Sequence, residues 1–220
     1  VFKELVARRA RNPPGDGSAG PSVRITRKAV AAGVTIARKG SALTGSRSLR
    51  ENLRSPLPRG AVETFLDVFS TPALTWADLA KAREWTSLPI LLKGIAHPDD
   101  AARAIDEGVD GVWVSNHGGR QIDTSVPTLD VLPEIVERVG GRAPIVFDSG
   151  VRTGTEALIA LALGADVVAI GRPYAYGLGI AGEEGVAEVI RNILAELDIT
   201  LGLAGRTCVR GVDRGVLREV

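Results

Sequence analysis

Four short apolar runs alternate with longer amphipathic segments over residues 89–172. The runs are 89–94, 111–115, 144–150 and 166–172, and each delivers a polar or charged residue where its apolar stretch stops. Short runs rich in β-branched residues and bounded by glycine or proline are typical of buried parallel strands. We therefore expect four parallel strands that deliver polar side chains at their carboxyl ends.

The segments between these runs predict helices. Asp99 and Asp100 place negative charge at the start of a helix over 99–108, and Thr153 and Glu156 open another over 153–164. Between them, apolar residues keep helical spacing over 129–139 until two glycines end the pattern. Strand and helix in alternation predict an α/β fold with a parallel sheet and right-handed crossovers.

The segment 114–123 holds the most informative candidate chemistry. It places His117 and Arg120 three positions apart, directly after the second run. An imidazole can accept a proton near neutral pH, and a guanidinium can grip a carboxylate with two hydrogen bonds. Gly118 and Gly119 allow a sharp turn between them. A glycine turn with an exposed histidine is the alternative, and the other three strand ends argue against it.

Four motifs resemble those of the FMN-dependent 2-hydroxy acid oxidases and dehydrogenases, a family that includes glycolate oxidase and lactate oxidase. The match runs over about 69–209, and its motifs lie at 88–94, 115–121, 148–154 and 160–173. Within the family, the sequence is most similar to lactate 2-monooxygenase, through 69–76 and 172–174. The resemblance implies a flavoprotein with FMN as cofactor and a small L-2-hydroxy acid, lactate-like, as substrate.

The resemblance also implies roles for the residues of the second strand end. His117 would bind the substrate and act as the catalytic base, and Arg120 would hold the substrate carboxylate. The product would be a 2-oxo acid or its oxidative decarboxylation product. The residues leave open whether the electrons leave as hydride or through a carbanion, and which acceptor reoxidises the flavin.

The remaining motif residues would bind FMN. By the resemblance, Lys93 would lie beside the flavin pyrimidine edge and Ser115 would hydrogen-bond the flavin. The loops after the last two strands of a barrel are a recurrent phosphate site. The residues expected there are Asp148, Ser149, Gly150, Val151, Arg152, Gly171 and Arg172.

The family's fold is a TIM (β/α)8 barrel, and the four runs correspond to strands five to eight, the C-terminal half. We expect residues 1–60 to be a basic, partly flexible loop or insert containing glycine and proline, as at 12–18, and residues 61–220 to form the half-barrel. The sequence lacks methionine and begins with Val1, which fits an alternative start codon or a truncated reading frame. We expect a C-terminal half, either a fragment or a chain that pairs with a separate N-terminal half. If full length, it would be a homo-oligomer. A non-catalytic flavin- or phosphate-binding remnant remains an alternative.

Charge is distributed unevenly along the chain. Residues 1–60 hold 13 Lys and Arg against 3 Asp and Glu, although the whole chain has a net charge of +1. A basic segment can bind nucleic acid, but Phe2 is its only aromatic residue, so we expect no nucleic-acid partner. No run is long enough to span a membrane and no secretory signal opens the sequence, so we expect a cytoplasmic location.

Other sites and enzyme classes are less consistent with the sequence. His97 reads as a loop or helix-start residue, because no metal-ligand spacing links it to His117, and Cys208 stands alone. Among other phosphate-binding barrels, the 117–120 motif argues against a type 2 isopentenyl diphosphate isomerase. The absence of cysteine over 89–172 argues against an IMP dehydrogenase.

Overall fold

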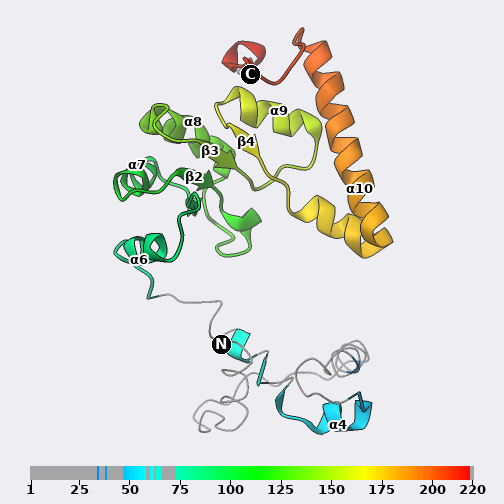
Figure 1. Ribbon diagram of the computed structural model, residues 1–220. Helices are drawn as coiled ribbons and strands as arrows, with labels where there is room; N and C mark the ends of the chain where they lie inside the picture. Colours follow the sequence, from blue (N-terminus) through cyan, green and yellow to red (C-terminus); the bar gives the residue numbers. More distant parts are fainter. Residues whose placement is uncertain are drawn as a thin grey trace. The chain divides into compact units, whose positions relative to one another are not determined.

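The computed structural model describes residues 34, 38, 47–57, 60–61, 63–65 and 73–218 (Figure 1). The chain divides into two compact units, Val1–Leu74 and Thr75–Val220, and each is described by itself. In the first unit, α4 (Leu49–Arg54) begins where the Ser48 hydroxyl accepts a hydrogen bond from the Glu51 amide. This helix lies within the segment expected to be a loop, whereas the stretch 12–18 lies outside the described residues. The boundary at residue 60 stays a prediction.

The second unit contains the predicted sheet. Its four strands are β1 (Leu91–Ile95), β2 (Gly111–Val114), β3 (Ile145–Phe147) and β4 (Val167–Val168), all parallel and in the order β1-β2-β3-β4. Their carboxyl ends therefore lie along one edge of the sheet, which brings the polar residues after each strand near one another.

The three predicted helices are confirmed with small shifts of their ends: α7 (Pro98–Asp106), α8 (Thr128–Val139) and α9 (Gly154–Ala162). At the start of α7, His97 is a helix cap, because its Nδ1 accepts a hydrogen bond of 3.2 Å from the Asp99 amide. At the start of α9, Thr153 and Glu156 form a reciprocal capping box. A further helix, α6 (Asp78–Trp85), precedes β1.

The helices cover the sheet and form the hydrophobic core with it. Leu132, Ile135 and Val139 of α8 are fully buried, as are Val112 of β2 and Phe147 of β3. Burial of side chains this large contributes about 1.5–3 kcal/mol each. The central strands are thus held firmly, and the loops at their carboxyl ends start from a rigid base.

The 32-residue helix α10 (Arg172–Leu203) follows β4 and was not foreseen from the sequence. It leaves helical geometry at Ala181 and Gly182, and its C-terminal part lies along α9 (Figure 1). Two 3-10 turns, η1 (His117–Gly119) and η2 (Arg214–Val216), complete the second unit. Among the described residues, no helix combines the length and the apolar character that a membrane span requires.

Candidate active site

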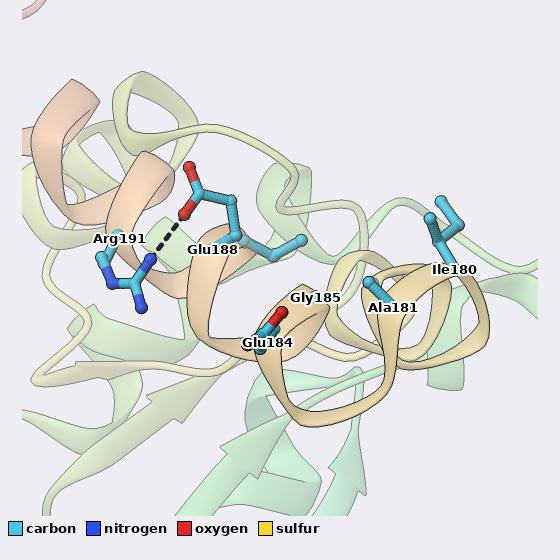
Figure 2. Close-up of a pocket in the computed structure, with 8 residues that line it drawn as sticks. Ile180, Ala181, Glu184, Gly185, Glu188 and Arg191 are labelled. Atoms are coloured by element: carbon cyan, nitrogen blue, oxygen red, sulfur yellow. Dashed lines mark hydrogen bonds and ion pairs between the residues drawn. The ribbon is translucent and has the colours of Figure 1, made fainter.

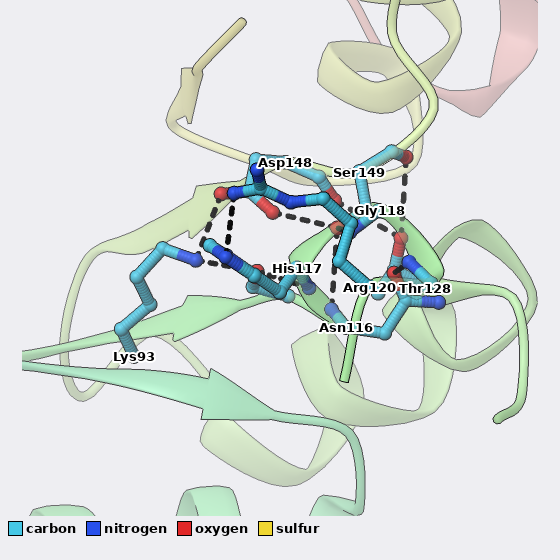
Figure 3. Close-up of polar contacts among 10 residues, drawn as sticks. Lys93, Asn116, His117, Gly118, Arg120, Thr128, Asp148 and Ser149 are labelled. Atoms are coloured by element: carbon cyan, nitrogen blue, oxygen red, sulfur yellow. Dashed lines mark hydrogen bonds and ion pairs between the residues drawn. The ribbon is translucent and has the colours of Figure 1, made fainter. Parts of the chain in front are cut away.

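Three strand ends bring their polar side chains together at the carboxyl edge of the sheet (Figure 3). Lys93 of β1 donates a hydrogen bond of 2.6 Å to the Ser115 hydroxyl, which follows β2. The same Lys93 Nζ lies 3.1 Å from Asp148 Oδ2, which follows β3. The sheet thus assembles Lys93, Ser115 and Asp148, three of the predicted FMN-binding residues, into one charged group.

Ser115 connects this group to the His117 turn. Its side chain is only 2% exposed, and its hydroxyl also accepts a hydrogen bond of 3.1 Å from the His117 amide. In the structure its hydroxyl therefore binds protein groups on two sides. A buried serine that is satisfied in this way fixes the start of the turn.

The turn η1 places His117 in a left-handed backbone conformation, with φ +57°, followed by Gly118 at +66° and Gly119 at +72°. A non-glycine residue rarely adopts such a φ and does so mostly where its surroundings hold it there. Asn116 is one such support, because its Oδ1 accepts the Gly119 amide at 3.2 Å and its Nδ2 donates to the Val126 carbonyl at 3.1 Å. The predicted sharp turn is confirmed.

His117 and Arg120 lie side by side, with Arg120 Nη2 2.6 Å from His117 Nε2. Because a guanidinium only donates, Nε2 is the acceptor and the neutral ring carries its proton on Nδ1. Burial and the positive charges of Arg120 and Lys93 lower the pKa of His117, and Asp148 opposes them. The imidazole is therefore held in the neutral form that can accept a proton.

Asp148 is the acidic member of the group. Burial raises its pKa, but hydrogen bonds from Ser115, Ser149 and Lys93, together with the charge of Lys93, outweigh burial and lower the pKa overall. The carboxylate is thus ionised, and it balances the positive charge of Lys93 beside the histidine.

The loops after β3 and β4 can hold an anion. Within the described part of the chain, the amides of Gly150, Val151, Gly171 and Arg172 have no protein acceptor, and the Arg152 guanidinium forms no ion pair. Beside Gly150 and Gly171, a Cβ would meet no atom within 4 Å, so both approaches are open. Open amides and free arginine charge are the donor set that a phosphate requires. The residues present therefore fit the phosphate of FMN.

The helix starts that follow these two loops differ in whether their amides already have acceptors. The amides of Arg152 and Thr153 already donate to Glu156, and the Gly154 amide donates to Glu196. The start of α9 is thus occupied by carboxylates, whereas α10 begins without a side-chain cap or an acidic residue in its first turn. Arg172 itself donates from Nη2 to the Gly118 carbonyl at 3.0 Å, which ties the β4 loop to the His117 turn.

Sequence reasoning gave no role to three residues that support the site. Asn116 caps the His117 turn, as described above. Thr128 is 2% exposed and donates to the Asp148 carbonyl at 3.0 Å, and Trp113 places its ring 5.3 Å from Lys93 Nζ. Asn116 lies inside the 114–123 motif, but Thr128 and Trp113 carry no local signal, because their contacts come from the packing of distant segments.

A separate cavity of about 590 Å³ lies at the bend of α10 (Figure 2). Its lining comes entirely from α10 and includes Ile180, Ala181, Glu188 and Arg191. None of the predicted site residues lines it, and Arg191 and Glu188 pair with each other at 2.5 Å. The candidate chemistry therefore resides at the sheet edge.

The fold and this charged group correspond to a class of flavin-binding α/β barrels. The family model described as FMN-dependent dehydrogenase matches residues 22–219, so the chain belongs to the FMN-dependent dehydrogenase family. The chain is 51% identical to an L-lactate oxidase of Lysinibacillus sphaericus (strain C3-41) over 71% of its own length and 42% of that protein. It is 47% identical to 2-hydroxyacid oxidase 1 of Mus musculus, over 67% of this chain and 40% of that protein.

A solved structure agrees with the sequence relatives. The chain superimposes on a mutant of an active chimera of (S)-mandelate dehydrogenase with a TM-score of 0.67 and 36% identity, covering 73% of this chain and 46% of the other. The chain thus forms part of a barrel, and it spans about two fifths of the length of the curated relatives it matches. The predicted family, fold class and FMN dependence of the family are confirmed.

Proposed function

We propose that the chain supplies the FMN- and substrate-binding end of an oxidoreductase that converts a small, lactate-like L-2-hydroxy acid to the 2-oxo acid. The observation that carries this proposal is the contact between His117 and Arg120 beside the Lys93–Asp148 pair. A base, a carboxylate clamp and a fixed cation then meet at one edge of the sheet. The names of the relatives, L-lactate oxidase and 2-hydroxyacid oxidase, support the same substrate class.

His117 and Arg120 have complementary roles in this proposal. Arg120 binds the substrate carboxylate through its planar fork, and in doing so it exchanges its hydrogen bond to His117 Nε2 for the new partner. The oxidation removes two protons and two electrons from the substrate, and the released Nε2 accepts one of these protons. FMN, when bound, would supply the acceptor for the two electrons and the remaining proton.

The cofactor is held by the strand ends in two places. The open amides after β3 and β4, with Arg152 and Arg172, would bind the phosphate, and Lys93 would supply positive charge to the flavin ring. Because Lys93 lies 3.1 Å from Asp148, its charge is fixed in position before the cofactor arrives. Such a preset charge stabilises negative charge on the flavin without reorganisation.

An N-terminal (β/α)4 unit completes the barrel in our proposal. In the described sheet β1 and β4 are the edge strands, and they expose apolar side chains, with Leu91 38% and Val167 53% exposed. Parallel sheets are almost always covered on both faces and avoid bare edges.

Homo-oligomerisation, a cytoplasmic location and the greater similarity to lactate 2-monooxygenase than to other family members stay predictions.

Anaerobic reduction of the FMN-loaded chain by L-lactate, with the N-terminal (β/α)4 unit supplied, tests the proposed function. We expect the visible absorbance of the oxidised flavin to bleach with L-lactate in the unmodified chain. His117→Ala should retain FMN and lose bleaching, whereas a matched His97→Asn variant, which keeps the cap of α7, should bleach normally. A His117→Ala variant that bleaches normally, or an unmodified chain that binds FMN but never bleaches, contradicts the proposal. The second result favours the non-catalytic FMN-binding alternative.

A further inference from the structure

Ser149 lies between the loop that follows β3 and the turn that carries His117. Sequence reasoning placed this residue among the phosphate ligands. In the structure its hydroxyl instead accepts hydrogen bonds from the amides of Asn116 at 3.2 Å and Gly118 at 3.1 Å. It also donates to Asp148 Oδ1 at 2.7 Å (Figure 3). Its hydroxyl hydrogen and its acceptor positions are thus used by protein groups.

The backbone of Ser149 adopts an unusual left-handed conformation. Its φ is +85°, and Ser149 and His117 are the only described non-glycine residues with positive φ. A conformation of this kind is unfavourable for a residue with a side chain and persists only where surrounding contacts hold it. The two unusual residues are joined, because Ser149 binds the amides on both sides of His117.

We propose that Ser149 is a positioning residue that holds the His117 turn and the Asp148 carboxylate in register. The two amides fix the backbone that flanks His117, and the donated hydrogen bond fixes the carboxylate that pairs with Lys93. Ser149 thereby sets where the imidazole lies relative to Arg120, Lys93 and Asp148. The inference rests on the proposed role of His117 as base, but its test requires neither FMN nor substrate.

A pair of substitutions separates the hydroxyl from the backbone conformation. Ser149→Ala removes the hydroxyl and keeps a side chain at positive φ, whereas Ser149→Gly removes the hydroxyl and relieves the conformational strain. If Ser149 acted only through its strained backbone, the two variants would affect the His117 turn to different extents, because only Ser149→Ala retains the strain. If the hydroxyl positions the turn, both variants should change the site equally.

The control is Ser125→Ala. Ser125 Oγ is buried and has no hydrogen-bond partner within the described structure, so its removal should leave the His117 turn unchanged. The residue lies in the loop between η1 and α8, close in sequence to the turn. It therefore controls for a general effect of removing a serine hydroxyl from this region.

The primary readout is amide hydrogen exchange by NMR in the cofactor-free chain. We expect the Asn116 and Gly118 amides to exchange roughly three- to tenfold faster in both Ser149 variants, because each loses its acceptor. The Val112 amide, which donates to the Pro144 carbonyl within the sheet at 3.1 Å, provides an internal reference.

The second readout is the pH titration of His117, which reports where the imidazole lies relative to its charged neighbours. The charged groups that face His117 are Arg120, Lys93 and Asp148. Once the turn loosens, the ring becomes more exposed and leaves Arg120 and Lys93, so its pKa should rise toward the ordinary value of about 6.5 in both variants.

Two results would overturn the proposal. One is an unchanged His117 titration and unchanged amide exchange in both Ser149 variants. The other is an effect in Ser149→Ala that Ser149→Gly does not share, since that would assign the change to backbone strain. A loss of flavin reduction alone would bear on the proposed function, because these readouts do not involve FMN.

Discussion

At the scale of single residues, the site is a small network whose members fix one another's charge. Lys93 and Asp148 pair, Ser115 lies between the pair and the His117 turn, and Arg120 contacts the imidazole. The sequence allowed each of these residues to be proposed, because each follows an apolar run. It could not reveal their pairing, since hydrogen bonds such as Ser149 to Gly118 join segments that are 31 positions apart.

After burial, the charge of Arg120 is the largest cause of the lowered pKa of His117. Arg120→Ala removes a positive group beside the ring, so the pKa of His117 should rise, as measured by NMR titration. Arg120→Lys keeps the charge and should leave the titration closer to that of the unmodified chain. Both variants lose the bidentate grip, so the apparent affinity for L-lactate should fall roughly 10- to 100-fold. A His117 pKa that is unchanged in Arg120→Ala would contradict this account.

The lowered pKa of His117 also sets a pH dependence. Flavin reduction should fall as pH drops through that pKa, on the acid side of about 6.5. In the unfolded chain the pKa is higher, so the unfolded state binds more protons between the two values. The contribution of His117 to stability should therefore be complete above about pH 6.5 and be lost as pH falls through the folded pKa. Stability that rises on acidification over this window in the unmodified chain, but not in His117→Gln, would contradict the sign.

At the scale of elements, periodicity was sufficient to place the central strands and helices. The apolar spacing over 129–139 corresponds to α8, whose Leu132, Ile135 and Val139 are fully buried. The pattern failed at α10, because this helix exposes many apolar residues, among them Ile180 and Leu203, and so lacks a clean polar face. A helix with such a surface cannot be predicted from the spacing of its apolar residues alone, because that spacing does not show which elements pack against it.

The contact between α9 and α10 depends on a residue without a side chain. A Cβ on Gly154 would lie 2.1 Å from the Leu197 amide nitrogen and 2.6 Å from the Ile193 carbonyl oxygen. Because both atoms are backbone, α10 would have to move, and Gly154→Ala should lower the free energy of unfolding by about 1–3 kcal/mol. Gly202→Ala is the matched control. A Cβ there meets nothing within 4 Å, so urea denaturation should show a neutral or slightly stabilising effect. Equal effects of the two substitutions would contradict the packing described.

At the scale of the whole molecule, a half-barrel sheet carries a recognisable set of site residues. Parallel strands deliver their polar ends to one edge, so four strands bring Lys93, His117, Asp148 and Arg172 within reach of shared partners. The family and the fold class were predictable because four motifs occur in order along the sequence. The four motifs cover only the last four strands of a barrel. Site residues contributed by the first four strands could therefore not be assigned.

The central claim is that this edge of the sheet binds FMN through the open amides and arginines after β3 and β4. The most direct measurement is an FMN titration of the purified chain, followed by flavin fluorescence and absorbance, and compared among three proteins. The unmodified chain and Arg138→Ala, whose side chain pairs with Asp99 away from these loops, should bind FMN alike. Arg152→Ala should bind roughly 10- to 100-fold more weakly, because a charged phosphate contact is lost. No FMN binding by the unmodified chain, or equal binding by Arg152→Ala, would contradict the account.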